Sequence, residues 1–465
     1  MFAIARAGMI CVSMNPAYQP PELDYSLKKV DIKAIFTPEV FKKQKHYEIL
    51  MNLMAKDKHY SSMNVIVHSK KKLPGAISYH ELLKSSSESD VAQIENLQPS
   101  ISADDPFNIQ FSSGTTGQPK AAVLSHFNMV NNGYDQGVRQ ELNKNYRRIC
   151  LNNPFFHVYG QVIGIMNATI HGSTLVLPAP HFSPEDSLRA IIKEKCDVIY
   201  GTPTMYIDLV AKQREINVDL PEVAFANTGG AICTPKLIHD METVLKAKKI
   251  RSIYGLTETT AGAFQSLADD DNKKSQEFVG HVCDHLEAKV IDSDGNPVPF
   301  GKPGELCIRG YSTMLGYWKD DAKTKEVLDS GKWFKTGDQF VLYENGYGKV
   351  VGRLKEMIIR GGENLFPREI EDFLSTHANI IEAHVIGIPD ERMGEEVGAF
   401  IRLKDGSKVL TRDDVKEFCK GKLSHFKVPR YVVVVDEFPR TISGKIQKFK
   451  FLEVFKNRLT NAVAK

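Results

Sequence analysis

Residues Phe111 to His126 read FSSGTTGQPKAAVLSH and hold the strongest local signal in the chain. Small residues let backbone N–H groups wrap around a phosphate, and hydroxyl and ammonium groups add donors and positive charge. The candidate phosphate ligands are Ser112, Ser113, Gly114, Thr115, Thr116, Gly117 and Lys120. A flexible turn has a similar composition. A Walker loop is a second alternative, but that motif places Gly-Lys directly before Ser or Thr, whereas here Pro119 precedes the lysine and Ala121 follows it.

On both sides of this loop, up to about residue 270, short β-branched runs alternate with segments of helical period. The runs AIFTPEVF, STLVLPAP and DVIYGTP are typical of strands, and SPEDSLRAIIKEKC is typical of a helix. Such alternation favours an α/β fold with βαβ units around a largely parallel sheet. From Val279 to Val351 the pattern changes to short strands broken by turns, which predicts a mainly antiparallel, β-barrel-like subdomain.

The C-terminal part has the pattern of a separate, smaller unit. After Arg353 a Gly-Gly loop leads to Pro367 and a helix with acidic residues in its first turns, as helix N-termini prefer. Strand runs AHVIGIP, GAFIRLKD and YVVVVD and the helix TRDDVKEFCKGKL follow. We therefore predict a large N-terminal domain over residues 1–352, a hinge over 353–356 and a small α+β C-terminal domain over 357–465.

Composition and charge place the chain among ordinary globular enzymes. Of 465 residues, 42% are hydrophobic and 25% are charged, and 60 Lys and Arg against 57 Asp and Glu give a net charge of +3. This balance demands neither nucleic acid nor a membrane partner, and no apolar run is long enough for a membrane helix. The seven cysteines are scattered and never spaced C-x-x-C, which favours reduced thiols in the cytosol or the mitochondrial matrix. The opening stretch MFAIARAGMICVSM is expected to be a buried internal segment.

Four further motifs follow the first in order, namely YGLTETT (254–260), FKTGD (334–338), GRLKEMIIRGGEN (352–364) and PRTISGKIQK (439–448). Together with S-G-T-T-G-x-P-K, they resemble the adenylate-forming superfamily of acyl-CoA synthetases, luciferases and peptide-synthetase adenylation domains. The resemblance covers essentially the whole chain. The stretches GELCIRGYSTMLGYW and FCKGKLSHFKVP are most similar to the mitochondrial medium-chain acyl-CoA ligases. The resemblance implies ATP, Mg²⁺, coenzyme A and a fatty acid as ligands or substrates.

The resemblance assigns the nucleotide contacts residue by residue. Glu258, after Thr257, supplies a hard carboxylate suited to Mg²⁺, although a lone Thr-Glu is otherwise typical of a helix N-terminus. The resemblance implies Thr115 as a second metal ligand. It places Tyr254 and Gly255 beside the adenine, and the other wall is formed by Gly229, Gly230 and Ala231.

The ribose is assigned to the T-G-D motif. Asp338 can accept hydrogen bonds from two neighbouring ribose hydroxyls, although most aspartates after glycine close turns. Arg353 resembles the arginine of the family that contacts ribose and phosphate, and its planar fork suits that contact better than lysine would.

The catalytic assignments rest on the resemblance as well. Lys445, in S-G-K, is the expected adenylation lysine, which bridges the carboxylate oxygen and the α-phosphate as charge builds up. Lys355 is the expected hinge, and rotation about it presents Gly361, Gly362 and Glu363 to the thiol channel. His157 is the expected gate between acid pocket and channel, although a lone histidine near aromatic residues is more often a packed core residue.

Three features depart from the family pattern. Ala121 replaces the usual glycine after Lys120, and Glu356 replaces the usual aspartate after the hinge. The opening residues resemble a segment that family members reach only after on the order of a hundred residues, so an N-terminal truncation is expected.

The sequence therefore predicts a ligase that joins a fatty acid, of medium chain length by resemblance, to coenzyme A through an acyl-adenylate. An inactive nucleotide-binding homologue, an adenylation module serving a carrier protein and a luciferase-like oxygenase stay open as alternatives. The expected compartment is the mitochondrial matrix by resemblance, or the cytoplasm in the absence of a presequence. Oligomeric state is not readable from these residues.

Overall fold

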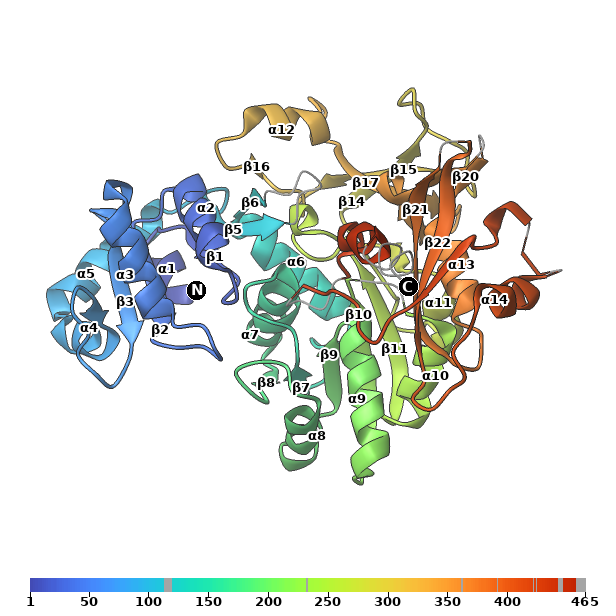
Figure 1. The fold of residues 1–465 in the computed structure, drawn as a ribbon. Coiled ribbons are helices and arrows are strands. Elements are labelled where there is room, and N and C mark those ends of the chain that lie inside the picture. The colour runs from blue at the N-terminus through green and yellow to red at the C-terminus, as the bar shows by residue number, and fades with distance from the viewer. Residues whose placement is uncertain are drawn as a thin grey trace.

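The computed structural model describes residues 1–112, 119–230, 233–360, 363–390, 392–420, 422–423, 425–441 and 446–456. An eleven-stranded sheet runs through the large domain in the order β14-β15-β17-β18-β13-β12-β11-β10-β9-β7-β8 (Figure 1). Its strands are β7 (Arg148–Leu151), β8 (Thr174–Val176), β9 (Val198–Gly201), β10 (Val223–Gly229), β11 (Ala247–Tyr254), β12 (Phe264–Gln265), β13 (Gly280–Val282), β14 (Leu286–Ile291), β15 (Pro303–Gly310), β17 (Phe334–Leu342) and β18 (Tyr347–Arg353). The strands from β8 to β11 are parallel, and the others are antiparallel. The antiparallel strands predicted for 279–351 are thus present and extend the parallel sheet.

Helices of the large domain connect its strands, and several of them cover the parallel part of the sheet. They are α6 (His126–Arg139), the π-helix η3 (Tyr159–Met166), α7 (Asn167–His171), α8 (Pro184–Lys193), α9 (Pro203–Ile216), α10 (Pro235–Thr243), η4 (Thr257–Thr259), α11 (Asn272–Glu277) and α12 (Asp321–Val327). Three of them start in the same way, since α8, α9 and α10 each have proline at the first position and a capping hydroxyl from Ser183, Thr202 or Thr234. Their apolar faces pack on β9, β10 and β11 through residues such as Ile191 and Tyr206, which are fully buried.

A second sheet carries the glycine-rich motif. Its order is β1-β5-β6-β16, with bounds β1 (Cys11–Ser13), β5 (Pro106–Ser112), β6 (Lys120–Ser125) and β16 (Gly316–Tyr317). Strands β5 and β6 form an antiparallel pair, and β16 pairs with the other edge of β6. Two chain segments that lie far apart in the sequence therefore meet at the end of the motif.

Whereas β1 belongs to the second sheet, most of the first hundred residues form a lobe, drawn in blue in Figure 1. It contains the parallel sheet β2 (Ala34–Pro38), β3 (Asn64–His68) and β4 (Ile77–Ser78), and the helices α1 (Phe2–Arg6), α2 (Pro20–Val30), α3 (His46–Lys56), η1 (Lys58–Tyr60), α4 (Tyr79–Ser85), α5 (Glu88–Leu97) and η2 (Gln98–Ser100). The prediction that the opening segment is buried is wrong for α1, which has no buried residue. Phe2 is 45% exposed and Met9 is 55% exposed.

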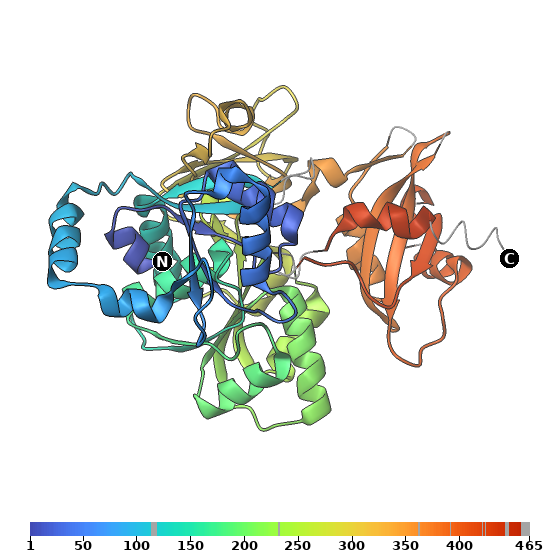
Figure 2. The same cartoon turned by 60° about the vertical axis from the view of Figure 1, so that its left-hand side comes forward.

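The C-terminal part has its own sheet and core. The sheet comprises β19 (Ile358–Arg360), β20 (Glu363–Leu365), β21 (Ile380–Asp390), β22 (Gly394–Leu403) and β23 (Tyr431–Val434), and the helices are α13 (Pro367–Leu374), α14 (Arg412–Cys419), η6 (His425–Lys427) and η7 (Lys448–Lys450). Figure 2 shows this part beside the large domain. The short helix η5 (Leu354–Glu356) separates β18 of the large sheet from β19 and occupies the predicted hinge. Within the described residues, no helix combines the length and apolarity that a membrane span needs.

Candidate active site

The candidate site starts at the ends of β5 and β6, which flank the glycine-rich loop. Ser112 and Lys120 are partners in the antiparallel register, so they lie side by side at the two ends of this loop. The loop ligands predicted between them, Ser113, Gly114, Thr115, Thr116 and Gly117, lie outside the described residues. The phosphate cradle itself therefore stays a prediction.

Glu258 joins this loop to the turn after β11. It lies in η4, and the residue is only 7% exposed. The Ser112 hydroxyl donates to Glu258 Oε1 at 2.7 Å, and the Tyr317 hydroxyl donates to the same oxygen at 3.0 Å. The Lys120 ammonium lies 5.0 Å from the centre of the Tyr317 ring. Glu258 therefore accepts two hydroxyl hydrogen bonds on one carboxylate oxygen, and one of the donors comes from the end of the glycine-rich loop.

Tyr317 was not predicted as a site residue. Burial, followed by the negative charge of Glu258, raises the pKa of the Tyr317 hydroxyl, so it stays a proton donor. Its position follows from the pairing of β16 with β6, in which Tyr317 is the partner of Ala122. The motif GYW contains this tyrosine, but the 59 positions between Tyr317 and Glu258 leave no local signal of their contact.

The turn that carries Glu258 depends on small residues. A Cβ on Gly255 would lie 1.8 Å from the carbonyl oxygen of Ala261, so any other residue would push the two backbone segments apart. Thr257, predicted with Glu258, is buried beside it in η4. Thr260 ends η4 in the left-handed region at a φ of 53°. The tight turn thus brings the end of β11 back toward the glycine-rich hairpin.

A second group of polar residues lies at the other end of this turn. The Tyr254 hydroxyl donates to Asp338 Oδ2 at 2.7 Å, and Arg353 Nε lies 3.2 Å from Asp338 Oδ1. Asp338 on β17 and Arg353 on β18 are partners in the antiparallel register. The Thr336 hydroxyl accepts a hydrogen bond from the Asp338 backbone N–H. The structure therefore brings together three of the residues predicted for the adenine and the ribose.

Charge and burial are coupled in this second group. Burial and then the Asp338 carboxylate raise the pKa of the Tyr254 hydroxyl well above its usual value. Burial lowers the pKa of the Arg353 guanidinium, but Asp338 and other acidic groups outweigh it, so the net shift is upward. The tyrosine thus stays protonated and the arginine stays charged, so both can donate hydrogen bonds to Asp338.

The predicted adenine wall lies at the end of β10. A Cβ on Gly229 would lie 2.5 Å from Ile253 Cγ2 and 2.7 Å from the Ile253 carbonyl oxygen, next to Tyr254. Gly230 has a φ of +84°, which a side chain would strain. The third member of the wall, Ala231, lies outside the described residues. This glycine pair thus permits the close approach of two strands beside Tyr254.

His157 precedes the π-helix η3. Its Nδ1 accepts a hydrogen bond of 3.2 Å from the Tyr159 N–H, so the ring is held against its own chain. Val158, Val162 and Ile163 are buried in the core, whereas Phe155 is 41% exposed. The apolar residues that follow His157 therefore belong to the core of the large domain. The gating role of His157 stays a prediction.

Several predicted residues cannot be placed. Lys445, Gly361 and Gly362 lie outside the described residues, and so do the side chains of Lys355 and Glu363. The backbone of Lys355 lies in η5. The predicted roles of these residues in catalysis, hinge motion and thiol access stay predictions.

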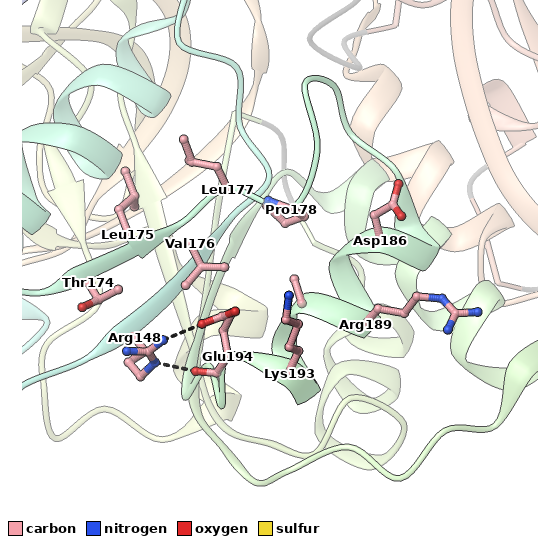
Figure 3. Close-up of a pocket in the computed structure, with 11 residues that line it drawn as sticks. Arg148, Thr174, Leu175, Val176, Leu177, Pro178, Asp186, Arg189, Lys193 and Glu194 are labelled. Carbon is pink, nitrogen blue, oxygen red and sulfur yellow. Dashed lines mark hydrogen bonds and ion pairs between the residues drawn. The ribbon is translucent and has the colours of Figure 1, made fainter.

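One surface cavity lies away from all these residues. It has a volume of about 440 Å³ and lies between β8 and α8, with Arg148 and Lys193 in its lining (Figure 3). Arg148 forms an ion pair of 2.9 Å with Glu194 at its rim. Its lining residues include none of the predicted site residues, so the cavity is not part of the candidate site.

The chain is similar to known proteins over nearly its whole length. The profile of the AMP-binding enzyme family matches residues 1–318, and that of the AMP-binding enzyme C-terminal domain matches residues 369–445. The medium-chain acyl-CoA ligase ACSF2, mitochondrial, of Danio rerio is 42% identical over 97% of this chain and 76% of its own length. The putative acyl-CoA synthetase YngI of Bacillus subtilis is 35% identical over 97% of this chain and 84% of its own length. ATP-bound MatB from Rhodopseudomonas palustris has a TM-score of 0.82 and 26% identity, covering 98% of this chain and 85% of that one.

Proposed function

This chain belongs to the AMP-binding enzyme family, and from that membership we propose that it is an ATP-dependent acyl-CoA ligase for a medium-chain fatty acid. One observation carries the proposal. Tyr254 and Glu258 lie on a single turn, and each contacts a different polar group, Asp338 on one side and Ser112 on the other. In the proposed complex, ATP binds along this turn, with its ribose at Asp338 and its phosphates at the glycine-rich hairpin.

The first step joins the acid to AMP. A carboxylate oxygen of the acid attacks the α-phosphorus of ATP, the bond from that phosphorus to the bridging oxygen breaks, and pyrophosphate leaves with the bond electrons. The protein positions the two anions and neutralises the charge that develops. Lys120 and Lys445 are the cations proposed for the phosphates, with Lys445 at the attacking oxygen. Asp338 and Tyr254 fix the nucleoside so that the α-phosphorus faces the acid.

Glu258 is the residue proposed to hold Mg²⁺. Among the described residues, both hydrogen bonds to its carboxylate end on Oε1, and Oε2 is the oxygen proposed for the cation. Magnesium commonly binds one or two carboxylates together with substrate phosphates, which suits a single buried glutamate beside a phosphate loop. Thr115 is the proposed second ligand. Bound there, the cation offsets the negative charge of the triphosphate.

The second step transfers the acyl group to coenzyme A. The thiolate attacks the acyl carbonyl, the bond to the phosphate oxygen breaks, and AMP leaves. We propose that the C-terminal domain turns at Lys355 between the steps, so that Lys445 withdraws and the segment from Gly361 to Glu363 faces the thiol. The location of η5 between the two sheets supports a hinge there. The mitochondrial matrix is the proposed compartment, by analogy with the ligases named above.

Pyrophosphate release tests the proposal. Purified protein is mixed with ATP, Mg²⁺ and octanoate, with and without coenzyme A, and pyrophosphate and octanoyl-CoA are measured. We expect release that rises with coenzyme A and a thioester in equal amount. Folded protein that binds ATP but releases no pyrophosphate with acids from acetate to palmitate would favour the inactive nucleotide-binding homologue. Pyrophosphate without thioester would favour transfer to another acceptor.

A further inference from the structure

Arg440 links the C-terminal part of the chain to the large domain. Its Nη1 donates a hydrogen bond of 2.9 Å to the hydroxyl of Thr204, 236 positions earlier in the chain. Its Nη2 contacts both carboxylate oxygens of Glu382 at 2.6 and 2.5 Å. Glu382 lies on β21 of the C-terminal sheet, and Thr204 lies in the first turn of α9. One guanidinium group therefore bridges two domains.

Glu382 anchors this arginine firmly on its own domain. Its side chain is only 11% exposed, and it also contacts His384 at 2.8 Å and Arg402 at 3.6 Å. Burial opposes ionisation, but His384 and the two arginines outweigh it and hold the pKa of Glu382 below its usual value. A guanidinium fork held by a carboxylate keeps its remaining N–H donors in a fixed direction. The donor aimed at Thr204 is thus preorganised.

The large-domain end of this contact lies beside the proposed nucleotide site. Thr204 is two residues after Thr202, which follows β9 and caps α9. A Cβ on Gly230, in the proposed adenine wall, would lie 3.9 Å from the Thr202 methyl group. Arg440 therefore docks on the helix that begins next to this wall.

On the C-terminal domain, the contact lies next to the segment that carries Lys445. We call the residues at the two ends of this segment, Arg440 and Ile446, its base. Arg440 and Ile446 form an isolated antiparallel bridge, and the Gln447 N–H donates to the Pro439 carbonyl at 2.8 Å. These two interactions bring together the ends of the segment 441–445. The contact of Arg440 with α9 therefore fixes the position of both ends of this segment.

Charges around the contact agree with an interface between the domains. Asp208 lies one turn after Thr204 on α9. Burial raises the pKa of the Asp208 carboxyl and Glu382 adds to that rise to a smaller extent, while Arg440 and Arg402 oppose it. The positive groups of the C-terminal domain thus face an acidic side chain of the large domain, which favours the same docked orientation.

We propose that Arg440 is a positioning residue for the first half-reaction, with the Thr204 hydroxyl as its receptor. It holds the base of the Lys445 segment against α9 while acyl-AMP forms, and it releases Thr204 when the C-terminal domain turns for thioester formation. The inference rests on the proposed function, because it assigns the contact to one of two steps.

Separate assays of the two half-reactions test this role. Acyl-AMP formation is measured in a single turnover with ATP and octanoate, and thioester formation is measured from synthetic octanoyl-AMP and coenzyme A. Thr204→Val keeps the side-chain shape and removes the acceptor. We expect Thr204→Val to slow the first step about 10-fold, because one charge-assisted hydrogen bond is lost. The rate of the second step should stay within about twofold of wild type. Arg440→Lys, which keeps the charge but lacks the fork, is expected to slow the first step as well.

Thr243→Val is the matched control, because the Thr243 hydroxyl bonds within α10 to the His239 carbonyl. It should change neither step. Equal slowing of both steps in Thr204→Val, or no slowing of either, would overturn the inference.

Hydrogen exchange gives a readout that does not need activity. The Gln447 amide reports the base of the Lys445 segment, although it lies in the other domain from Thr204. We expect Thr204→Val to raise its exchange rate several-fold and Thr243→Val to leave it unchanged. An unchanged Gln447 amide in Thr204→Val would contradict the contact, even where the wild-type protein releases no pyrophosphate. Absence of pyrophosphate release in the wild type would instead contradict the proposed function.

Discussion

The Ser112 hydroxyl donates a hydrogen bond of 2.7 Å to the Glu258 carboxylate across 146 positions of sequence. This hydrogen bond joins the N-terminal end of the glycine-rich loop to the turn that follows β11. The buried carboxylate is held by hydroxyl donors and has no protein cation in direct contact among the described residues. An anion in that setting suits a cation brought with the substrate.

Glu258→Gln should remove the charge that binds Mg²⁺ and keep the shape of the side chain. We expect pyrophosphate release to fall about 100-fold or more, on the scale of a lost electrostatic contact in a buried active site. The measurement is the rate as a function of Mg²⁺ concentration. Glu277→Gln, at an exposed position on α11, is the control and should behave as wild type. A Glu258→Gln variant with the wild-type Mg²⁺ dependence would contradict the assignment.

Tyr254→Phe removes the donor to Asp338 and leaves the ring in place. The lost hydrogen bond to a charged group is worth about 1.5–3 kcal/mol, so we expect the KM for ATP to rise about 10-fold or more, with kcat changed less. Steady-state kinetics with varied ATP test this. Tyr343→Phe serves as the control, since its ring packs edge-to-face against Phe278. A change in kcat alone would argue against ground-state nucleotide binding by this pair.

Lys445→Ala should affect the two half-reactions unequally. We expect acyl-AMP formation to fall by at least about 100-fold, because the charge on the attacking oxygen and α-phosphate loses its partner. Thioester formation from synthetic octanoyl-AMP should stay close to wild type, since the lysine has withdrawn by then. Lys450→Ala, an exposed neighbour, is the control. Equal loss in both assays would show that Lys445 is not specific to the first step.

Lys448→Met should destabilise the C-terminal domain in a pH-dependent way. Lys448 Nζ lies 2.7 Å from Glu371 and 3.0 Å from Glu356. Burial raises the pKa of Glu371, but Lys448 and His384 outweigh it and lower the pKa overall. Wild-type Glu371 therefore stabilises the fold above the usual glutamate pKa of about 4.3, and this stability is lost as the pH falls through the lower folded pKa.

Removing the lysine leaves Glu371 buried without this partner, which costs about 3–5 kcal/mol at pH 7. The folded pKa of Glu371 then rises, so the variant takes up a proton sooner on acidification. We expect the difference in unfolding midpoint between wild type and variant to be largest at pH 7 and to shrink toward pH 4. Urea unfolding at a series of pH values measures this, with Lys450→Met as control. A pH-independent difference would contradict the ion pair as its source.

Local sequence signals were sufficient for much of the fold. The pattern Ser183-Pro184 marked the start of α8, and Pro367 marked the start of α13, because a cap and a first-turn proline act within a few residues. The change from alternating βαβ runs to turn-rich strands likewise matched the change from parallel to antiparallel pairing. The motifs also named Tyr254, Asp338 and Arg353, which the structure brings into contact.

The opening segment shows where such signals fail. Its apolar composition predicted burial, but Phe2 and Met9 are exposed. An apolar side chain gains free energy when it is buried, but its burial requires a surface from another part of the folded molecule. The composition of the segment does not show whether such a surface is present.

The resemblance of the motifs to the adenylate-forming superfamily thus implied a nucleotide site with Glu258 at the phosphates and Asp338 at the ribose. The contacts of Tyr317 with Glu258 and of Arg440 with Thr204 came from the packing of distant elements. Periodicity and capping depend on interactions between residues a few positions apart. They do not indicate which strand edges pair or how one domain docks on another. Those outcomes depend on the register of β16 against β6 and on the partly buried ion pair with Glu382 that orients Arg440.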